Sequence, residues 1–227
     1  MSSQDLSTTT LAFATSHQLA IPPPIFPKLI LLDRDGVINE DVGSPGVISP
    51  SQLQLTPNAA SAIGQLRRKS SQVALVTNQS CVGKGLITKQ DLNEIHDELQ
   101  RKLCKDDKDA TWDGLYQCLA TKQDNDRRMK PNPGMIFDAM QDFDVKAEEC
   151  VFVGDTLTDM QAASAAGVRL KILVSTGYGL GLMNGYDVQD DPVLIHYMLD
   201  SNMDSVTPFV YAKNLQVASN WLCGRYH

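Results

Sequence analysis

The sequence has no apolar run that approaches the roughly 20 residues of a membrane-spanning helix; its notable apolar stretch, Leu29–Leu32, is only strand-sized. Cysteine is scarce, with five widely spaced residues and no CxxC pair. This usage argues against a disulfide scaffold or a zinc knuckle and predicts reduced thiols in an intracellular protein. Basic residues are outnumbered 27 to 20, for a formal net charge of -7. We therefore expect no broad nucleic-acid or membrane surface, although a small basic pocket for one phosphate is compatible with this charge.

Lysine and arginine are missing from the first 27 residues, which are Ser/Thr-rich at first and Pro-rich at their end. A secretory signal needs a basic start, and a transit peptide needs arginines. We expect residues 1–27 to form a flexible extension and residues 28–227 to form a single domain. A weak plastid address or a docking arm is the alternative for the extension. Otherwise we expect a cytoplasmic protein.

Beyond the extension, short apolar runs alternate with stretches of helical periodicity. The expected strands are residues 28–33, 73–78, 115–119, 150–155 and 169–175. The expected helices begin at Thr56-Pro57, Thr88, Asn132-Pro133, Leu157 and Asn214. This alternation predicts the α/β class, as a doubly wound three-layer sandwich with a mainly parallel sheet. His96 and His196 fall in helix-like stretches, and we predict partly exposed helix residues at both positions.

Polar residues gather where the predicted strands end, which is where parallel sheets bind ligands. Taken singly, each has an ordinary interpretation as a turn residue, a helix cap or a surface charge. Their succession along the chain is harder to explain in that way, since it repeats at four places. The set comprises Asp33 and Asp35, then Thr77 and Asn78, then Lys130, then Asp155 and Asp159.

The segments that carry these residues resemble a known family. LLDRDGVIN, LVTNQS, KPNPGM and VFVGDTLTD resemble the four motifs of the haloacid dehalogenase superfamily of phosphohydrolases. INEDVG, TNQSCVGKG and STGYG resemble the subgroup of D-glycero-D-manno-heptose 1,7-bisphosphate phosphatase and the histidinol-phosphatase domain. The resemblance runs from about Lys28 to Gly179. Because about 40 residues separate the first two motifs, we expect a minimal cap domain or none.

The resemblance implies a phosphomonoesterase that acts on a small phosphorylated metabolite, with a sugar phosphate favoured. It implies that Asp33 is the nucleophile of an aspartyl-phosphate intermediate, and that Asp35 is the general acid and then the general base. A raised pKa would help Asp35 in the first role. The resemblance also implies Mg²⁺, held by Asp33, the main-chain carbonyl of Asp35 and Asp155, with Asp159 outside the direct ligands. The expected substrate contacts are Thr77, Asn78, Gln79, Asp41, Arg128 and Lys130, of which Thr77 and Lys130 also count as catalytic.

The chain departs from its subgroup at several positions. Many members hold zinc with three cysteines and one histidine, but in CLATKQDNDRRMKP only Cys118 is present. One thiol cannot build a four-coordinate site, so we predict no structural zinc. Met129 stands where the subgroup favours arginine, and Ser44 stands at an aromatic position. These changes leave the chemistry intact and affect substrate recognition.

Three other functions compete with a sugar-phosphate phosphatase. The first is a histidinol-phosphate phosphatase. The second is a polynucleotide 3′-phosphatase, against which the net charge of -7 argues. The third is a non-catalytic phospho-acceptor or scaffold. This interpretation is poorer, because every catalytic residue type is present. We expect no nucleic-acid or membrane partner, and a monomer or weak dimer.

Overall fold

The computed structural model describes residues 26–168, 170–184, 196–198 (main chain only), 206 and 209–224. Within these ranges, seven strands form one sheet in the order β3-β2-β1-β4-β5-β7-β6. Every described pairing is parallel except that of β6 with β7, which confirms the predicted mainly parallel sheet. The strands are β1 (Leu29–Leu32), β2 (Gln72–Asn78), β3 (Gly114–Cys118), β4 (Cys150–Gly154), β5 (Leu170–Val174), β6 (His196–Met198) and β7 (Phe209–Ala212).

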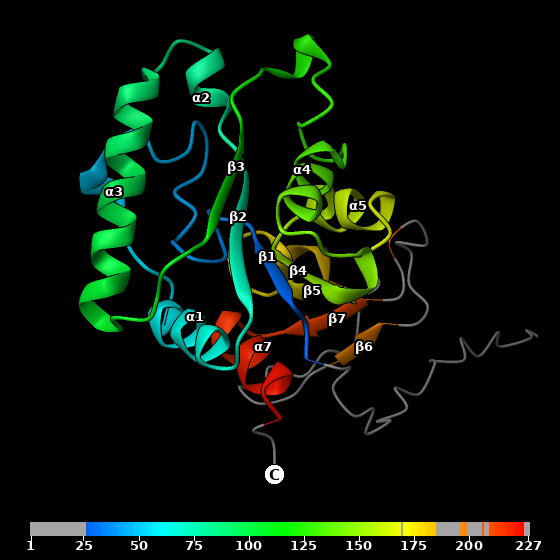
Figure 1. Ribbon diagram of the computed structural model, residues 1–227. Coiled ribbons are helices and arrows are strands. Elements are labelled where there is room, and N and C mark those ends of the chain that lie inside the picture. The colour runs from blue at the N-terminus through cyan, green and yellow to red at the C-terminus, as the bar shows by residue number, and fades with distance from the viewer. Residues whose placement is uncertain (1–25, 169, 185–195, 199–205, 207–208, 225–227) are drawn as a thin grey trace, which may run out of the picture.

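Helices cover both faces of this sheet, so the fold is a three-layer sandwich (Figure 1). One face carries α1 (Ala59–Arg68), α3 (Lys89–Asp106) and α7 (Leu215–Leu222), and the other carries α4 (Gly134–Asp142) and α5 (Leu157–Ala165). Shorter helices are α2 (Ser80–Gly83) and α6 (Gly179–Leu182), with 3₁₀ turns at Pro50–Gln52, Lys122–Asp124 and Ala147–Glu149.

The interior strand β1 shows why the sheet is buried on both sides. Ile30 and Leu32 belong to the core under α1, α3 and α7, whereas Leu29 and Leu31 belong to the core under α4 and α5. Successive strand residues point to opposite faces, so a strand covered on both sides needs an unbroken apolar run. Each of these side chains is fully buried, which stabilises the fold by about 1.5–3 kcal/mol apiece.

Helix α3 confirms the local signals read from its sequence. The Thr88 hydroxyl accepts from the Asp91 amide (3.1 Å), and the Asp91 carboxylate accepts from the Thr88 amide (2.8 Å). This reciprocal capping box satisfies donors that the first helical turn leaves free. The predicted apolar face is buried; its residues are Leu92, Ile95, Leu99 and Leu103. His96 is buried with them, at 4% exposure, so the prediction of a partly exposed histidine was wrong.

Two further expectations about secondary structure need correction. Helix α1 begins at Ala59 instead of Thr56-Pro57, because Asn58 adopts a left-handed conformation (φ 61°) and the Thr56 hydroxyl donates to the Val37 carbonyl (2.7 Å). His196 lies in strand β6 rather than in a helix. The strand β7, parallel to β5, was not predicted.

Two residues that precede the expected boundary at residue 28 contact the folded part of the chain. Phe26 packs against the core, and the Pro27 carbonyl accepts a hydrogen bond from Ser71 (2.6 Å). Residues 1–25 lie outside the described residues, so the flexible extension stays a prediction. The described residues form no second globular unit that could serve as a cap, and none of their helices has the length and apolar character to cross a membrane.

Candidate active site

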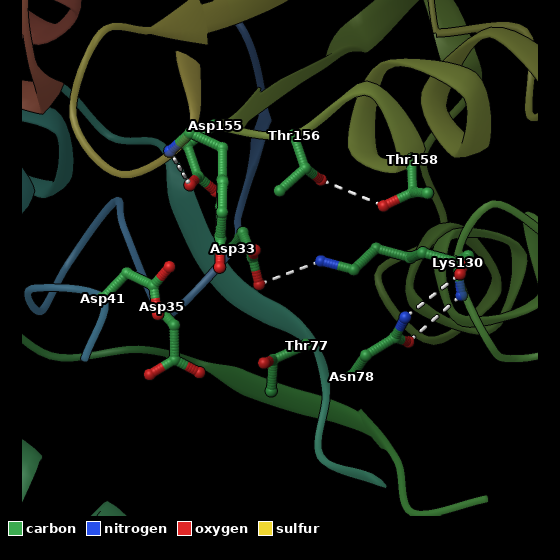
Figure 2. A pocket seen from close by; sticks show the side chains of 10 residues that line it. Asp33, Asp35, Asp41, Thr77, Asn78, Lys130, Asp155, Thr156 and Thr158 are labelled. Atoms are coloured by element: carbon green, nitrogen blue, oxygen red, sulfur yellow. Dashed lines mark hydrogen bonds and ion pairs between the residues drawn. The ribbon is translucent and has the colours of Figure 1, made fainter. Parts of the chain in front are cut away.

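A pocket of about 150 Å³ opens at the carboxyl ends of β1, β2 and β4. β2 and β4 flank β1 on either side, so the pocket lies at the point where the strand order reverses, as expected for a doubly wound sheet. Most of the predicted site residues converge here (Figure 2). The pocket is lined by Asp33, Asp35, Asp41, Thr77, Asn78, Lys130, Asp155, Thr156, Thr158 and Tyr178.

Lys130 contacts two carboxylates and a main-chain carbonyl at the pocket. Its ammonium lies 2.9 Å from Asp33 Oδ1 and 2.6 Å from Asp159 Oδ1, and it donates to the Val76 carbonyl (2.9 Å). Burial lowers the pKa of Lys130, but the two carboxylates outweigh burial and raise it above its ordinary value. Lys130 is therefore a fixed cation directly beside Asp33.

Three buried carboxylates could hold a metal ion. Asp33, Asp155 and Asp159 each offer an oxygen, and these oxygens lie within 4.8 Å of one another. Burial first, and then the neighbouring carboxylates, raise the pKa of Asp155. Its Oδ1 is buried without a hydrogen-bond partner in the described structure, while its Oδ2 accepts from the Tyr178 amide (3.0 Å). This oxygen-only set with an unpartnered atom fits a hard divalent cation such as Mg²⁺.

Asp159 differs from Asp155 because its Oδ1, which has no hydrogen-bond partner either, forms an ion pair, while its Oδ2 accepts hydrogen bonds. Oδ1 pairs with Lys130, and Oδ2 accepts from the hydroxyl (2.6 Å) and the amide (3.0 Å) of Thr156. Asp159 is also the reciprocal partner that caps α5. Its geometry suits the predicted role outside the direct metal ligands.

Two glycines allow the loops to close around Asp155. Gly36 (φ 80°) and Gly177 (φ 60°) both adopt left-handed conformations, and a Cβ on either would collide with the Asp155 carboxylate. A side chain is therefore excluded on steric and conformational grounds at both positions. The loops after β1 and β5 can thus approach the carboxylate that follows β4.

Asp35 is held from several directions. Arg34 Nη2 donates to both of its oxygens (3.0 and 2.9 Å), and Asn39 and Gln79 each donate one further hydrogen bond (2.9 Å). Burial raises the pKa of Asp35, but the Arg34 charge and these hydrogen bonds lower it overall. The raised pKa that would suit a resting general acid is therefore not present. Asp35 is instead held as a carboxylate, the form that a general base requires.

Three predicted substrate contacts have other partners. Gln79 is buried, donates a hydrogen bond to the Asp35 carboxylate and does not line the pocket. Arg128 forms an ion pair with Asp138 (3.0 Å) away from the pocket lining. Asn78 does line the pocket, but its amide donates to and accepts from the Lys130 main chain (both 3.1 Å). In this structure Gln79 and Arg128 thus contact other side chains and lie outside the pocket lining, so their roles as substrate contacts stay predictions, while Asn78 contacts the main chain of Lys130.

Besides Lys130, two more of the predicted substrate contacts line the pocket, Thr77 and Asp41. Thr77 lines the pocket, and its hydroxyl oxygen accepts a hydrogen bond from Gln79 (2.9 Å). The Thr77 hydroxyl proton is therefore available to donate to an acceptor other than Gln79. Asp41 lines the mouth, where its charge and its hydrogen bond raise the pKa of Tyr178. Tyr178 was missed as a site residue, although STGYG had been singled out as a motif.

Comparison with known proteins agrees with this geometry. The model of the haloacid dehalogenase-like hydrolase family matches residues 40–167. The D-glycero-beta-D-manno-heptose-1,7-bisphosphate 7-phosphatase of Bordetella bronchiseptica is 39% identical over 152 residues, covering 67% of this chain and 83% of that protein. The protein of the same name from Neisseria meningitidis serogroup A is 35% identical over 175 residues, covering 76% and 91%.

A solved structure has the same fold. The crystal structure of D,D-heptose 1,7-bisphosphate phosphatase from B. bronchiseptica, complexed with magnesium and phosphate, aligns with a TM-score of 0.73 at 31% identity. The alignment covers 88% of this chain and 99% of that one.

The sandwich and its strand-end carboxylates thus define a hydrolase of the haloacid dehalogenase-like class. The chain belongs to the haloacid dehalogenase-like hydrolase family, and the predictions of this fold and of a phosphatase are confirmed.

Proposed function

We propose that this phosphatase is a Mg²⁺-dependent phosphomonoesterase that hydrolyses a sugar phosphate through an aspartyl-phosphate on Asp33. The observation that carries the proposal is the buried cluster in which Lys130 lies 2.9 Å from Asp33, and Asp155 offers an unpartnered oxygen beside them. The relatives named above support the choice of a phosphosugar, and a heptose bisphosphate-like compound is the favoured substrate.

The two oxygens of Asp33 are not equivalent. Oδ1 accepts from the Arg34 amide (2.7 Å) and pairs with Lys130 (2.9 Å), while the described residues offer Oδ2 no donor. Oδ2 is thus the oxygen available to attack phosphorus. Bound Mg²⁺, held by Asp33, the Asp35 carbonyl and Asp155, would neutralise charge between these carboxylates and the phosphate. Lys130 and the Thr77 hydroxyl would stabilise the charge on the transferring phosphoryl oxygens.

Asp35 would serve both halves of the reaction. A phosphate placed beside it raises its pKa, because a nearby like charge disfavours the ionised form. Protonated Asp35 can then donate to the leaving alkoxide of the sugar. Once the leaving group has departed, ionised Asp35 can take a proton from the water that hydrolyses the aspartyl-phosphate.

The mouth of the pocket supports a hydroxyl-rich substrate. Asp41, Thr158 and Tyr178 present a carboxylate, an alcohol and a phenol, and Tyr178 is 56% exposed. Such groups exchange hydrogen bonds with sugar hydroxyls. Lys130 is the one cation among the described lining residues, which gives little support to a polyanionic nucleic acid. Asp41 could also pair with the ammonium of histidinol phosphate, so that phosphatase activity is the second candidate.

The test is a phosphate-release screen with Mg²⁺. It should include sugar mono- and bisphosphates, histidinol phosphate, nucleotides and a 3′-phosphorylated oligonucleotide, with Asp33→Asn protein as the matched control. We expect a sugar phosphate to be the best substrate and EDTA to abolish release. Absence of release from every compound, or release that EDTA leaves unchanged, would contradict the proposal.

For the protein's state and surroundings, we infer a cytoplasmic monomer or weak dimer without structural zinc or nucleic-acid partners. The five cysteines are free thiols, which supports a reducing compartment. Cys118 is the only cysteine near the lysine motif, which supports the absence of zinc.

A further inference from the structure

Behind Asp35, away from the pocket lining, lies a buried pair of basic side chains. Arg34 follows β1 and is fully buried, and His96 lies on α3 with 4% exposure. Arg34 Nη1 lies 3.1 Å from His96 Nε2. The opposite edge of the guanidinium donates to Asp35 from Nη2 (2.9 and 3.0 Å) and Nε (3.3 Å). The guanidinium is therefore held on one side by a catalytic carboxylate and on the other by an imidazole.

The chemistry of the pair determines which ring nitrogen of His96 carries the proton. Arginine has only donors and stays protonated in proteins, so Nε2 of His96 must accept from Nη1. His96 is therefore the neutral tautomer with its proton on Nδ1. A second cation here would face Arg34 at hydrogen-bond distance in a buried site, where like charges repel strongly. His96 thus supplies an acceptor without supplying charge.

We propose that His96 is a positioning residue of the phosphatase: it fixes the orientation of Arg34, and through Arg34 it aligns the Asp35 carboxylate. This inference rests on the proposed acid/base role of Asp35. His96 is suited to the task because it lies on α3, whose buried residues Leu92, Ile95 and Leu99 fix the helix in the core. Without the imidazole, Nη1 of Arg34 would be a buried donor without its acceptor. The guanidinium could then rotate, and the Asp35 carboxylate would no longer be held in one orientation.

A merely structural role for His96 makes a different prediction. Loss of packing would lower the amount or stability of active protein and would affect all substrates equally. Misalignment of the general acid would instead matter most where the leaving group needs a proton. A sugar alkoxide needs one, whereas p-nitrophenolate departs without one. The ratio of kcat/KM for the two kinds of substrate therefore separates the two explanations, since kcat/KM includes leaving-group departure.

The experiment compares full-length wild type, His96→Leu and His96→Gln with Mg²⁺, using the best sugar phosphate of the screen and p-nitrophenyl phosphate. We expect His96→Leu to lower kcat/KM for the sugar phosphate by about tenfold more than for p-nitrophenyl phosphate, a loss within the range of general acid catalysis. We expect His96→Gln to recover most of this difference, because its carbonyl oxygen can accept from Nη1. Leu103→Val, at the far end of α3, is the matched core control and should not change the ratio.

Equal losses on both substrates, no loss, or failure of His96→Gln to recover the ratio would overturn the proposal. If His96→Leu does not fold, His96→Met is compared with His96→Gln in the same way. Wild-type protein that releases no phosphate from any sugar phosphate would overturn the proposed function, and the role of His96 with it. Active wild type with an unchanged ratio in the variants would overturn the role of His96 alone.

Discussion

Acid should destabilise this protein through His96. Burial, and then the positive charge of Arg34, lower the pKa of this histidine from 6.5 to about 4, although Asp35 acts in the opposite direction. In the unfolded chain the imidazole is exposed to water and titrates near its ordinary value. Below pH 6.5 the imidazole of His96 is therefore protonated in the unfolded state, while it stays neutral in the folded state until the pH approaches 4.

The sign and size of the effect follow from proton linkage. Because the folded pKa lies below the unfolded one, this contribution to stability is complete above pH 6.5 and is lost as the pH falls toward 4. With pKa values of 6.5 unfolded and about 4 folded, the free energy of unfolding should fall by about 2 kcal/mol between pH 8 and pH 5.

Urea unfolding of wild type and His96→Gln at both pH values measures this contribution. Glutamine does not titrate, and every other ionisable group is present in both proteins, so their contributions cancel in the comparison. We expect the wild type to lose about 2 kcal/mol more than the variant between pH 8 and pH 5. Any constant loss from the substitution itself does not enter this difference. Parallel losses in the two proteins, within about 0.5 kcal/mol, would refute the assignment of a buried neutral His96.

Other predictions concern the site itself. Asp33→Asn should abolish turnover, because an amide is a poor nucleophile, while circular dichroism stays native; full activity with deamidation excluded would refute the nucleophile assignment. Gly177→Ala places a Cβ against the Asp155 carboxylate, so a Mg²⁺ titration of activity should shift to about tenfold higher concentration; an unchanged midpoint would contradict this metal site. Arg128→Ala should leave kcat/KM within about twofold of wild type, because Arg128 pairs with Asp138 and surface ion pairs contribute little; a larger loss would restore it as a substrate contact. Metal analysis of purified protein should find no stoichiometric zinc, and one equivalent would contradict the prediction.

The sequence was sufficient for most of the fold. Strand β1 was predicted because an apolar run can be buried on both faces of a parallel sheet, and α3 because its capping box and apolar spacing act within one or two turns. These signals are local, so they need no knowledge of the rest of the chain. Strand β7 and the true start of α1 were missed. A short strand near the edge of the sheet and a left-handed conformation at Asn58 give only weak signals in the sequence.

Part of the site was determined in the same way. Parallel strands end at one edge of a sheet, so the residues at or after the carboxyl ends of β1, β2, β3 and β4 had to converge. Asp33, Thr77, Lys130 and Asp155 accordingly line one pocket. The sequence thus determined which chemical groups meet.

Only the tertiary structure decided what each group is bonded to. Gln79 reaches Asp35 across 44 residues of chain, and Arg34 reaches His96 across 62. No periodicity reports such contacts, because they depend on the angle at which distant elements pack. The same contacts set the charge of the site. They keep the Asp35 pKa low and His96 neutral, where the sequence alone predicted a substrate-binding glutamine and a partly exposed histidine.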